Sequence, residues 1–150
     1  MAMYKRILLA VDLASDSEHI IEKATQVVRD NDAELLLVHV NEPVVTAYQA
    51  GGVAGWSTQI VSLDEQIRKI AQDKMDALAS RLGVPADNCF LPYGKAAVEI
   101  KRVAEDHDVN LIIMGTHGRE GLGLMLGSTA NGVLHGVKCD VLAIRAIDND

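Results

Sequence analysis

The residues with the clearest chemical meaning form a glycine-rich run between an apolar stretch and a segment with helical spacing. Within residues 114–129 the chain carries glycine at positions 115, 118, 121, 123 and 127, followed by Ser128 and Thr129. Glycine lets backbone N–H groups approach an anion, and the helix that follows would add unpaired donors and a positive dipole end. The two hydroxyls could cap that helix and reach a phosphate from the same place. The run therefore predicts a phosphate cradle, and with it a nucleotide.

Other phosphate-binding motifs do not fit this sequence. A dinucleotide fingerprint should follow the first strand, but the first turn, residues 12–15, contains no glycine. A P-loop needs a lysine directly before its Ser or Thr, whereas Gly127 precedes Ser128. The glycine run is therefore a cradle of another kind.

Catalytic constellations are sparse along the chain. There is no H-E-x-x-H pair, no G-x-S-x-G elbow and no cluster of metal-ligand residue types. His117 lies within the glycine run, where an exposed turn residue is the simpler interpretation, and His39 in an apolar stretch is interpreted as a hydrogen-bonded core residue. The sequence therefore predicts binding rather than catalysis, with slow hydrolysis of the nucleotide or phosphotransfer to Ser128 or Thr129 as an alternative.

Five apolar stretches alternate with segments of helical spacing and must position these residues. The stretches are 7–11, 35–40, 89–93, 111–114 and 141–144, and continuous apolar runs are typical of parallel strands buried on both faces. Pro92 removes a hydrogen-bond donor, which places the third stretch at a sheet edge. The sequence predicts an α/β, three-layer sandwich: an open five-stranded parallel sheet of order 3-2-1-4-5 with helices on both faces.

The helical segments are recognised by their caps and their periodicity. The S-x-x-E pattern of residues 15–18 is a capping box before the first helix. A long helix after the second strand is expected to carry one apolar face, made of Leu63, Ile67, Ile70, Ala71, Leu78 and Leu82. Residues 41–58 before it form a longer connection than usual and are predicted to be a mobile insertion loop, while residues 147–150 are expected to be a frayed tail.

Size and composition are those of one globular domain over residues 1–150. The net charge of −7 argues against a nucleic-acid-binding protein that works through bulk electrostatics. The apolar stretch near the amino terminus is too short for a signal sequence or a membrane span. Cys89 and Cys139 are expected to be buried, reduced thiols. These features predict a cytoplasmic protein without nucleic-acid or membrane partners.

The topology indicates where a ligand would bind. In an open parallel sheet, ligands bind beyond the carboxyl ends of the strands, where the strand order reverses. Asp12 ends the first strand and Gly115 ends the fourth, so the two are expected to face each other there. The carboxylate could hold a ribose hydroxyl or a base amine while the glycine run holds phosphates. Capping of its own turn is the alternative role for Asp12.

Three segments resemble the universal stress protein family, and the resemblance covers nearly the whole chain. They are residues 4–12 (Y-K-R-I-L-L-A-V-D), residues 37–40 (L-V-H-V) and the more specific segment 114–145. ATP-binding members carry G-x-x-G, nine residues and G-[S/T], whereas eight residues, 119–126, separate Gly118 from Gly127 here. The resemblance implies a Rossmann-like fold of the adenine-nucleotide alpha hydrolase type. It also implies ATP as cofactor, with or without Mg²⁺, and AMP or another adenine nucleotide is the alternative ligand.

The resemblance also implies the residues of the nucleotide site. Asp12 would hold the adenosine, apolar residues at the ends of three strands would line the adenine pocket, and glycine amides with two hydroxyls would wrap ribose and phosphates. The expected binding residues are Ala10, Val11, Asp12, Val40, Met114, Gly115, Gly118, Arg119, Gly127, Ser128 and Thr129.

The last strand suggests how two chains would associate. The family implies a homodimer. Independently, residues 141–145 are expected to form an apolar edge strand in which the charge of Arg145 alone would do little to prevent pairing with another edge strand. The predicted function is a dimeric stress regulator that switches with a bound adenine nucleotide and presents an altered surface to a protein partner. The alternative is a nucleotide-free interaction module of the same fold.

Overall fold

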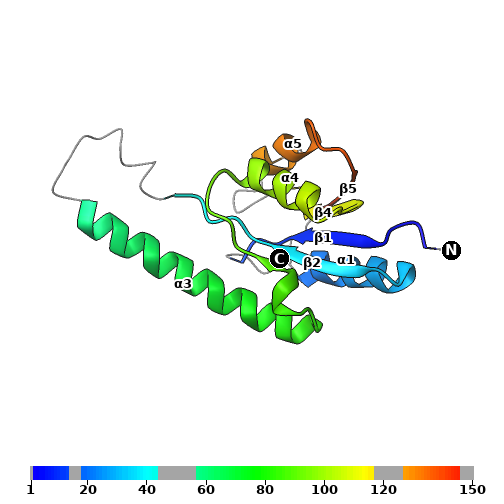
Figure 1. Cartoon of the computed structure of the whole chain (residues 1–150), viewed down its shortest axis with the longest axis horizontal. Helices are drawn as coiled ribbons and strands as arrows, with labels where there is room; N and C mark the ends of the chain where they lie inside the picture. The colour runs from blue at the N-terminus through cyan, green and yellow to red at the C-terminus, as the bar shows by residue number, and fades with distance from the viewer. Residues whose placement is uncertain (1, 14–17, 44–56, 117–126, 146–150) are drawn as a thin grey trace.

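The computed structural model describes residues 2–13, 18–43, 57–116 and 127–145, which alternate between strands and helices as the sequence predicts. In chain order the elements are β1 (Arg6–Ala10), α1 (Glu18–Asn31), β2 (Glu34–Val38), α3 (Ser57–Leu82), the 3-10 turn η2 (Ala86–Asn88), β3 (Cys89–Phe90), α4 (Ala96–Asp106), β4 (Leu111–Gly115), α5 (Ser128–Leu134) and β5 (Asp140–Ile144). Figure 1 shows the sheet between two layers of helices.

The five strands form one parallel sheet in the order β3-β2-β1-β4-β5, which confirms the predicted topology. The central strand β1 pairs on both sides, so that Leu9 lies beside Leu37 of β2 and beside Ile113 of β4. The strand order reverses between β1 and β4. The carboxyl ends of these two neighbours therefore form the switch point of the sheet.

The third strand lies at the edge, as Pro92 predicts, but it is shorter than the apolar stretch 89–93. Only Cys89 and Phe90 form β3. Beyond them the pairing with the chain after β2 continues as a single bridge between Asn41 and Tyr93. Pro92 has no N–H to donate and instead accepts a hydrogen bond from the Asn41 amide at 2.9 Å, so a regular ladder cannot continue.

Two apolar layers hold the helices against the sheet. On one face, strand side chains such as Leu9 and Ile113 pack against α1 and α3; on the other, Leu8 and Ile112 pack against α4 and α5. The alternation of side chains along each strand explains the division, because neighbouring residues point to opposite faces. Helices therefore cover both faces, as predicted (Figure 1).

The long helix α3 differs from the prediction at its beginning. It starts at Ser57, inside the predicted 41–58 loop, and its first turns extend beyond the sheet (Figure 1). The side chains of Leu63, Ile67 and Ile70 are 46%, 40% and 54% exposed, so this half of the expected apolar face does not reach the core, whereas Ala71 and Leu78 of the same face are buried. Within the described ranges, no strand lies beneath this half of the helix (Figure 1), and the buried face of α3 becomes apolar from Ala71 onward. Residues 44–56 and the tail 147–150 lie outside the described residues.

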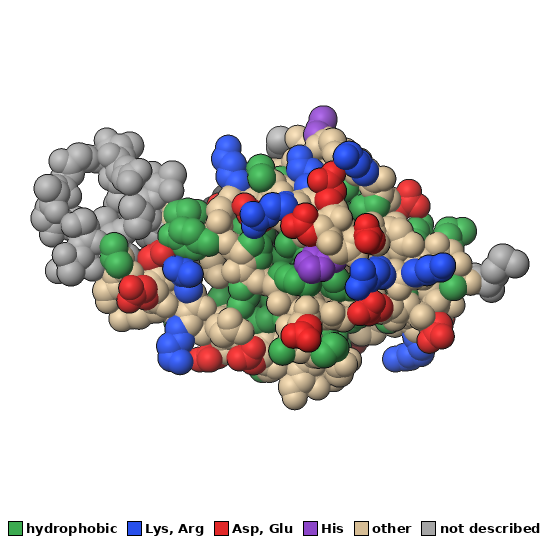
Figure 2. Space-filling view, viewed as in Figure 1, with side chains coloured by type: hydrophobic (Ala, Val, Ile, Leu, Met, Phe, Trp, Pro, Cys, Tyr) green, Lys and Arg blue, Asp and Glu red, His purple; other side chains and the backbone are tan. Residues whose placement is uncertain are grey.

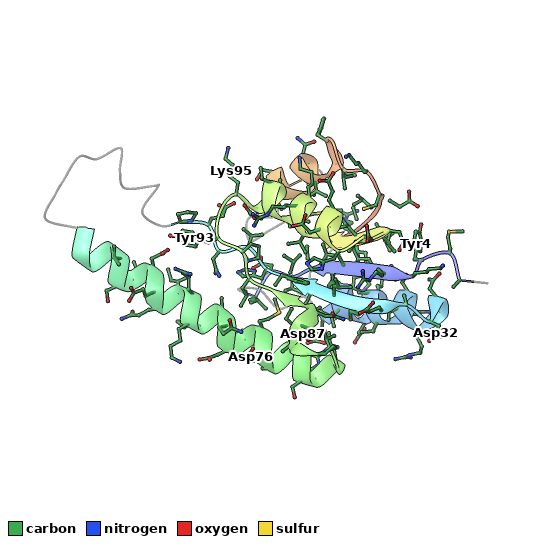
Figure 3. All side chains as sticks on the ribbon, viewed as in Figure 1. Tyr4, Asp32, Asp76, Asp87, Tyr93 and Lys95 are labelled. Carbon is green, nitrogen blue, oxygen red and sulfur yellow. The ribbon has the colours of Figure 1, made fainter. Side chains whose placement is uncertain are left out.

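A polar contact fixes the projecting half of α3. Tyr93, labelled in Figure 3, lies on the segment between β3 and α4, and its hydroxyl donates a 2.6 Å hydrogen bond to the buried carboxylate of Asp64. The guanidinium of Arg68 lies 4.7 Å from the centre of the Tyr93 ring. The hydrogen bond to Asp64 raises the pKa of Tyr93, because it requires the protonated hydroxyl.

The amino-terminal end of the sheet carries an acid-sensitive contact. Asn88 donates a 3.0 Å hydrogen bond to one carboxylate oxygen of Glu34, and Arg6 donates to the other, also at 3.0 Å. These donors, Asn88 first and then Arg6, lower the pKa of Glu34 because they stabilise its ionised form.

Both cysteines are free thiols, as predicted, although they are half-buried rather than fully buried. Burial raises the pKa of both Cys89 and Cys139. A raised pKa keeps the thiols protonated at neutral pH, so neither has the character of a reactive thiolate.

Candidate functional site

The residues expected at the switch point follow directly from the ends of β1 and β4. Val11 donates a 2.9 Å backbone hydrogen bond to Val38, and Thr116 donates one of 3.0 Å to Ile144, so the chain stays paired just beyond each strand. The pairing of β1 with β4 ends with Leu9 beside Ile113, and Asp12 and Thr116 each follow three residues later. Asp12 and the start of the glycine run therefore come just beyond the carboxyl ends of two neighbouring strands.

The three residues expected to line the adenine pocket, Ala10, Val40 and Met114, belong to one apolar layer. Met114 is buried in the layer beneath α4 and α5, and Ala10 and Val40 pack against the same layer while remaining half-buried. They come from the ends of β4 and β1 and from just beyond β2. Partly exposed aliphatic side chains in this arrangement can cover one face of a flat apolar ring. Val11 lies instead against the layer of α1 and α3, so the structure separates it from the other three.

The two ends of the glycine run are held together. The amide of Gly127 donates a 2.6 Å hydrogen bond to the carbonyl of Thr116, which closes the segment 117–126 at its base. Gly115 is half-buried at the last position of β4. Gly118 and Arg119 lie outside the described residues. The structure thus fixes where the run leaves the sheet and where it returns.

The return of the run into α5 corrects one expectation. The N-cap is Gly127, with φ −61° and ψ 154°, and not Ser128 or Thr129. The first hydrogen bond of the helix runs from the Asn131 amide to the Gly127 carbonyl at 2.9 Å, so the amides of the three residues between them have no acceptor within α5. Since α5 has only 7 residues, its dipole is weak and anion binding would depend on the amides of the run itself.

His39 makes the hydrogen bond that the sequence interpretation expected of it. Its half-buried ring lies just beyond β2, with Nδ1 2.9 Å from the carbonyl oxygen of Val11. Its own amide donates to Phe90 at 3.0 Å. The acceptor could not be predicted from the sequence, because it depends on the pairing of β2 with β1.

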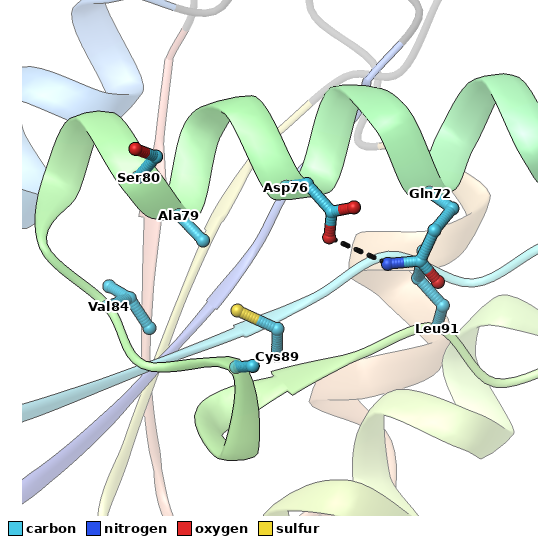
Figure 4. Close-up of a pocket in the computed structure, with 8 residues that line it drawn as sticks. Gln72, Asp76, Ala79, Ser80, Val84, Cys89 and Leu91 are labelled. Atoms are coloured by element: carbon cyan, nitrogen blue, oxygen red, sulfur yellow. Dashed lines mark hydrogen bonds between the residues drawn. The ribbon is translucent and has the colours of Figure 1, made fainter.

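Two pockets among the described residues lie away from the strand ends. One, of about 310 Å³, opens between α3 and the segment that contains β3; Cys89 lines it, and Gln72 donates a 2.8 Å hydrogen bond to Asp76 along α3 (Figure 4). The other, of about 440 Å³, lies between the end of α4 and the chain leading into β5, where Lys138 pairs with Glu105 at 3.2 Å. Neither pocket contains an expected nucleotide-binding residue.

Charge and metal-ligand patterns add little to the site. Figure 2 shows acidic and basic side chains interspersed over one face of the molecule, rather than gathered by sign. Across the described ranges, no three His, Cys, Asp or Glu residues are grouped as metal ligands. In the same part of the chain, no helix has both the length and the apolar character that crossing a bilayer requires.

Comparison with known proteins gives a consistent result. The profile of the universal stress protein family matches residues 3–145. Universal stress protein A homolog 2 of Coxiella burnetii is 40% identical over 146 residues, which cover 97% of each chain. The solved universal stress protein UspA from Lactobacillus plantarum has a TM-score of 0.79 at 24% identity and covers 97% of this chain and 100% of its own. A universal stress protein solved in complex with cAMP has a TM-score of 0.56 at 19% identity and covers 94% and 96%.

Proposed function

Because the chain belongs to the universal stress protein family, we propose that it binds an adenine nucleotide at the carboxyl ends of β1, β2 and β4. Binding, rather than turnover, is the proposed activity. The bound nucleotide would switch the surface that the protein presents to a partner in the stress response. ATP, with or without Mg²⁺, is the proposed ligand, and AMP or a cyclic nucleotide would use the same apolar surface.

The observation that carries the proposal is the meeting of three kinds of group at the switch point. Asp12 supplies a carboxylate two residues beyond β1; the half-buried side chains of Ala10 and Val40 belong to the apolar layer beneath α4 and α5; and the glycine run leaves from Thr116 and returns at Gly127, whose amide nitrogen lies 2.6 Å from the Thr116 carbonyl oxygen. An adenine nucleotide has a matching part for each: hydroxyl or amine donors, a flat ring and phosphates. Ligands of parallel α/β sheets bind at this position in the fold.

Each expected residue except Val11, which packs against the layer of α1 and α3, has a role in the proposed site. Ala10, Val40 and Met114 would contact the base, while Asp12 would accept a hydrogen bond from a ribose hydroxyl or the base amine. The remaining residues would surround ribose and phosphates: Gly115, Gly118, Arg119, Gly127, Ser128 and Thr129. The structure solved with cAMP, a protein of the same fold, supports adenine nucleotides as the class of ligand to test.

Thermal unfolding with added nucleotide tests the proposal. A ligand that binds only the folded chain at 100 times its Kd adds about 2.7 kcal/mol, which for a chain of this size raises the Tm by about 5–10 °C. Asp12→Asn or Gly118→Val should abolish most of this shift, whereas Asp106→Asn, at the end of α4, should retain it. An unchanged Tm of the wild-type protein in millimolar ATP, AMP and cAMP would contradict nucleotide binding and favour a nucleotide-free interaction module.

We further propose that two chains pair through β5 as a homodimer. β5 is an edge strand, Leu142 is 38% exposed and Ala143 is also exposed, so the outer edge offers both backbone hydrogen-bonding groups and apolar surface. A second copy related by a two-fold axis would cover both. Leu142→Lys should give a monomer in analytical ultracentrifugation, whereas Leu134→Lys, an exposed leucine on α5, should remain dimeric. A monomeric wild-type protein would refute this assembly.

A further inference from the structure

The imidazole of His39 reaches from the end of β2 to the end of β1. Its Nδ1 lies 2.9 Å from the carbonyl oxygen of Val11, and the ring is half-buried. A carbonyl oxygen only accepts hydrogen bonds, so Nδ1 carries the hydrogen and donates it. The neutral ring is thereby fixed in its Nδ1–H tautomer.

The accepting carbonyl belongs to the peptide unit that leads into Asp12. The carbonyl of Val11 and the amide of Asp12 lie in one plane. A donor that fixes the orientation of the carbonyl therefore also fixes the orientation of the Asp12 amide and the position of its Cα. Val11 is held on its other side as well, because its amide donates to Val38 at 2.9 Å. Both backbone polar groups of Val11 are therefore bound by consecutive residues at the end of β2.

His39 itself is anchored from the opposite side. Its amide donates a 3.0 Å hydrogen bond to Phe90 of β3 while its ring reaches β1, so one residue ties the ends of three strands together. Packing alone does not require a histidine here, since an aliphatic residue would continue the apolar strand Glu34–Val38 equally well. What the histidine adds is a donor for the Val11 carbonyl.

We propose that His39 is a positioning residue of the nucleotide site: its hydrogen bond to Val11 holds the peptide that carries Asp12, so that the carboxylate meets the ligand in one orientation. This inference rests on the proposed function, because Asp12 has a ligand to meet only if an adenine nucleotide binds at the strand ends. His39 acts through the backbone and does not itself touch the nucleotide.

Two substitutions separate the hydrogen bond from the shape of the ring. His39→Leu removes the donor, whereas the amide nitrogen of His39→Asn occupies nearly the position of Nδ1 and restores it. In ATP titrations followed by calorimetry, His39→Leu should raise the Kd about three- to tenfold, as expected for one lost hydrogen bond, and His39→Asn should stay within about twofold of the wild-type protein. His107→Leu is the matched control: this histidine lies at the carboxyl end of α4, and the variant should bind ATP normally.

A double substitution tests whether the effect passes through Asp12. In an Asp12→Ala background, titrated at ATP concentrations high enough to measure its weakened binding, His39→Leu should cause no further loss of affinity, because the positioned group is already absent. An unchanged Kd for His39→Leu, a failure of His39→Asn to restore it, or an equal loss in the Asp12→Ala background would overturn the role of His39 while leaving nucleotide binding intact. A wild-type protein that binds no adenine nucleotide would refute the proposed function, and the positioning role with it.

A measurement on the nucleotide-free protein keeps the inference testable even if a variant fails to fold. The ¹⁵N NMR shifts of the neutral His39 ring should show the Nδ1–H tautomer, which is the minor form of a free neutral histidine. A ring in the Nε2–H form cannot donate to Val11, and its observation would overturn the proposal directly.

Discussion

The contact between α4 and α5 leaves no room for a side chain at Gly132. A Cβ on Gly132 would lie 2.6 Å from the Cβ of Ala97, whereas ordinary contacts are 3.4–4 Å. Both atoms are fixed directly to helix backbones, so neither can rotate away. Gly132→Ala must therefore push the two helices apart by about 1 Å, since interiors are packed without spare space.

Two opposing effects decide the result of Gly132→Ala. Replacing glycine by alanine inside a helix usually stabilises it by up to about 1 kcal/mol. Overpacking at a tight contact costs about 1–3 kcal/mol. Because the Cβ atoms would overlap so closely, we expect the cost to dominate and the free energy of unfolding to fall by about 1 kcal/mol or more. The start of α5 would move too, and with it the Gly127–Thr116 hydrogen bond at the base of the glycine run, so nucleotide affinity should also fall.

Urea denaturation of four chains isolates the contact: wild type, Gly132→Ala, Ala97→Gly and the double variant. Ala97→Gly removes the atom that the new Cβ meets, although it costs about 1 kcal/mol in helix propensity. Gly132→Ala should therefore destabilise the wild-type chain and stabilise the Ala97→Gly chain. If it stabilises both backgrounds equally, α4 and α5 do not approach as described, and the reasoning fails.

Other properties of the fold can be tested in the same way. Met75→Ala should lower the free energy of unfolding by about 2–5 kcal/mol because Met75 is fully buried, whereas Ile67→Ala on the exposed side of α3 should cost less than about 1 kcal/mol; equal losses in urea denaturation would contradict the described burial. The raised pKa of Tyr93 means that its hydrogen bond stabilises the fold below pH 10.0 and that this stability is lost as the pH rises through the raised pKa. Tyr93→Phe should remove one late step from an alkaline absorbance titration, and an unaltered titration would refute the assignment. The lowered pKa of Glu34 means that its contacts stabilise the fold above pH 4.5 and are lost as the pH falls. Glu34→Gln should therefore make the urea midpoint less sensitive to acid, and unaltered sensitivity would contradict this.

The order of the strands and the burial of β1, β2 and β4 could be predicted from the sequence, whereas β3 is half-buried and β5 leaves Leu142 and Ala143 exposed. Continuous apolar runs indicate strands covered on both faces, and Pro92 marks the edge strand. The same reasoning failed for the first half of α3. Periodicity shows that Leu63 and Ile67 share a face of the helix, but only the extent of the sheet decides whether anything covers that face.

The site could be predicted only in part for a related reason. Asp12 and Gly115 follow from the strand ends and from the rule that ligands bind at the switch point. The contacts of Val11 could not be predicted, because the donor from His39 depends on how β1 and β2 are paired. The cap of α5 was misassigned because serine and glycine are both acceptable N-caps, and the Gly127–Thr116 hydrogen bond selects the glycine.

The most direct test of nucleotide binding is native mass spectrometry of the freshly purified protein, followed by mass analysis of the small molecules that it releases on unfolding. We expect the folded chain to carry one adenine nucleotide per subunit, or to take one up when ATP, AMP or cAMP is added, and the Asp12→Asn variant to lack it. A wild-type protein that carries no nucleotide and takes none up would contradict the account.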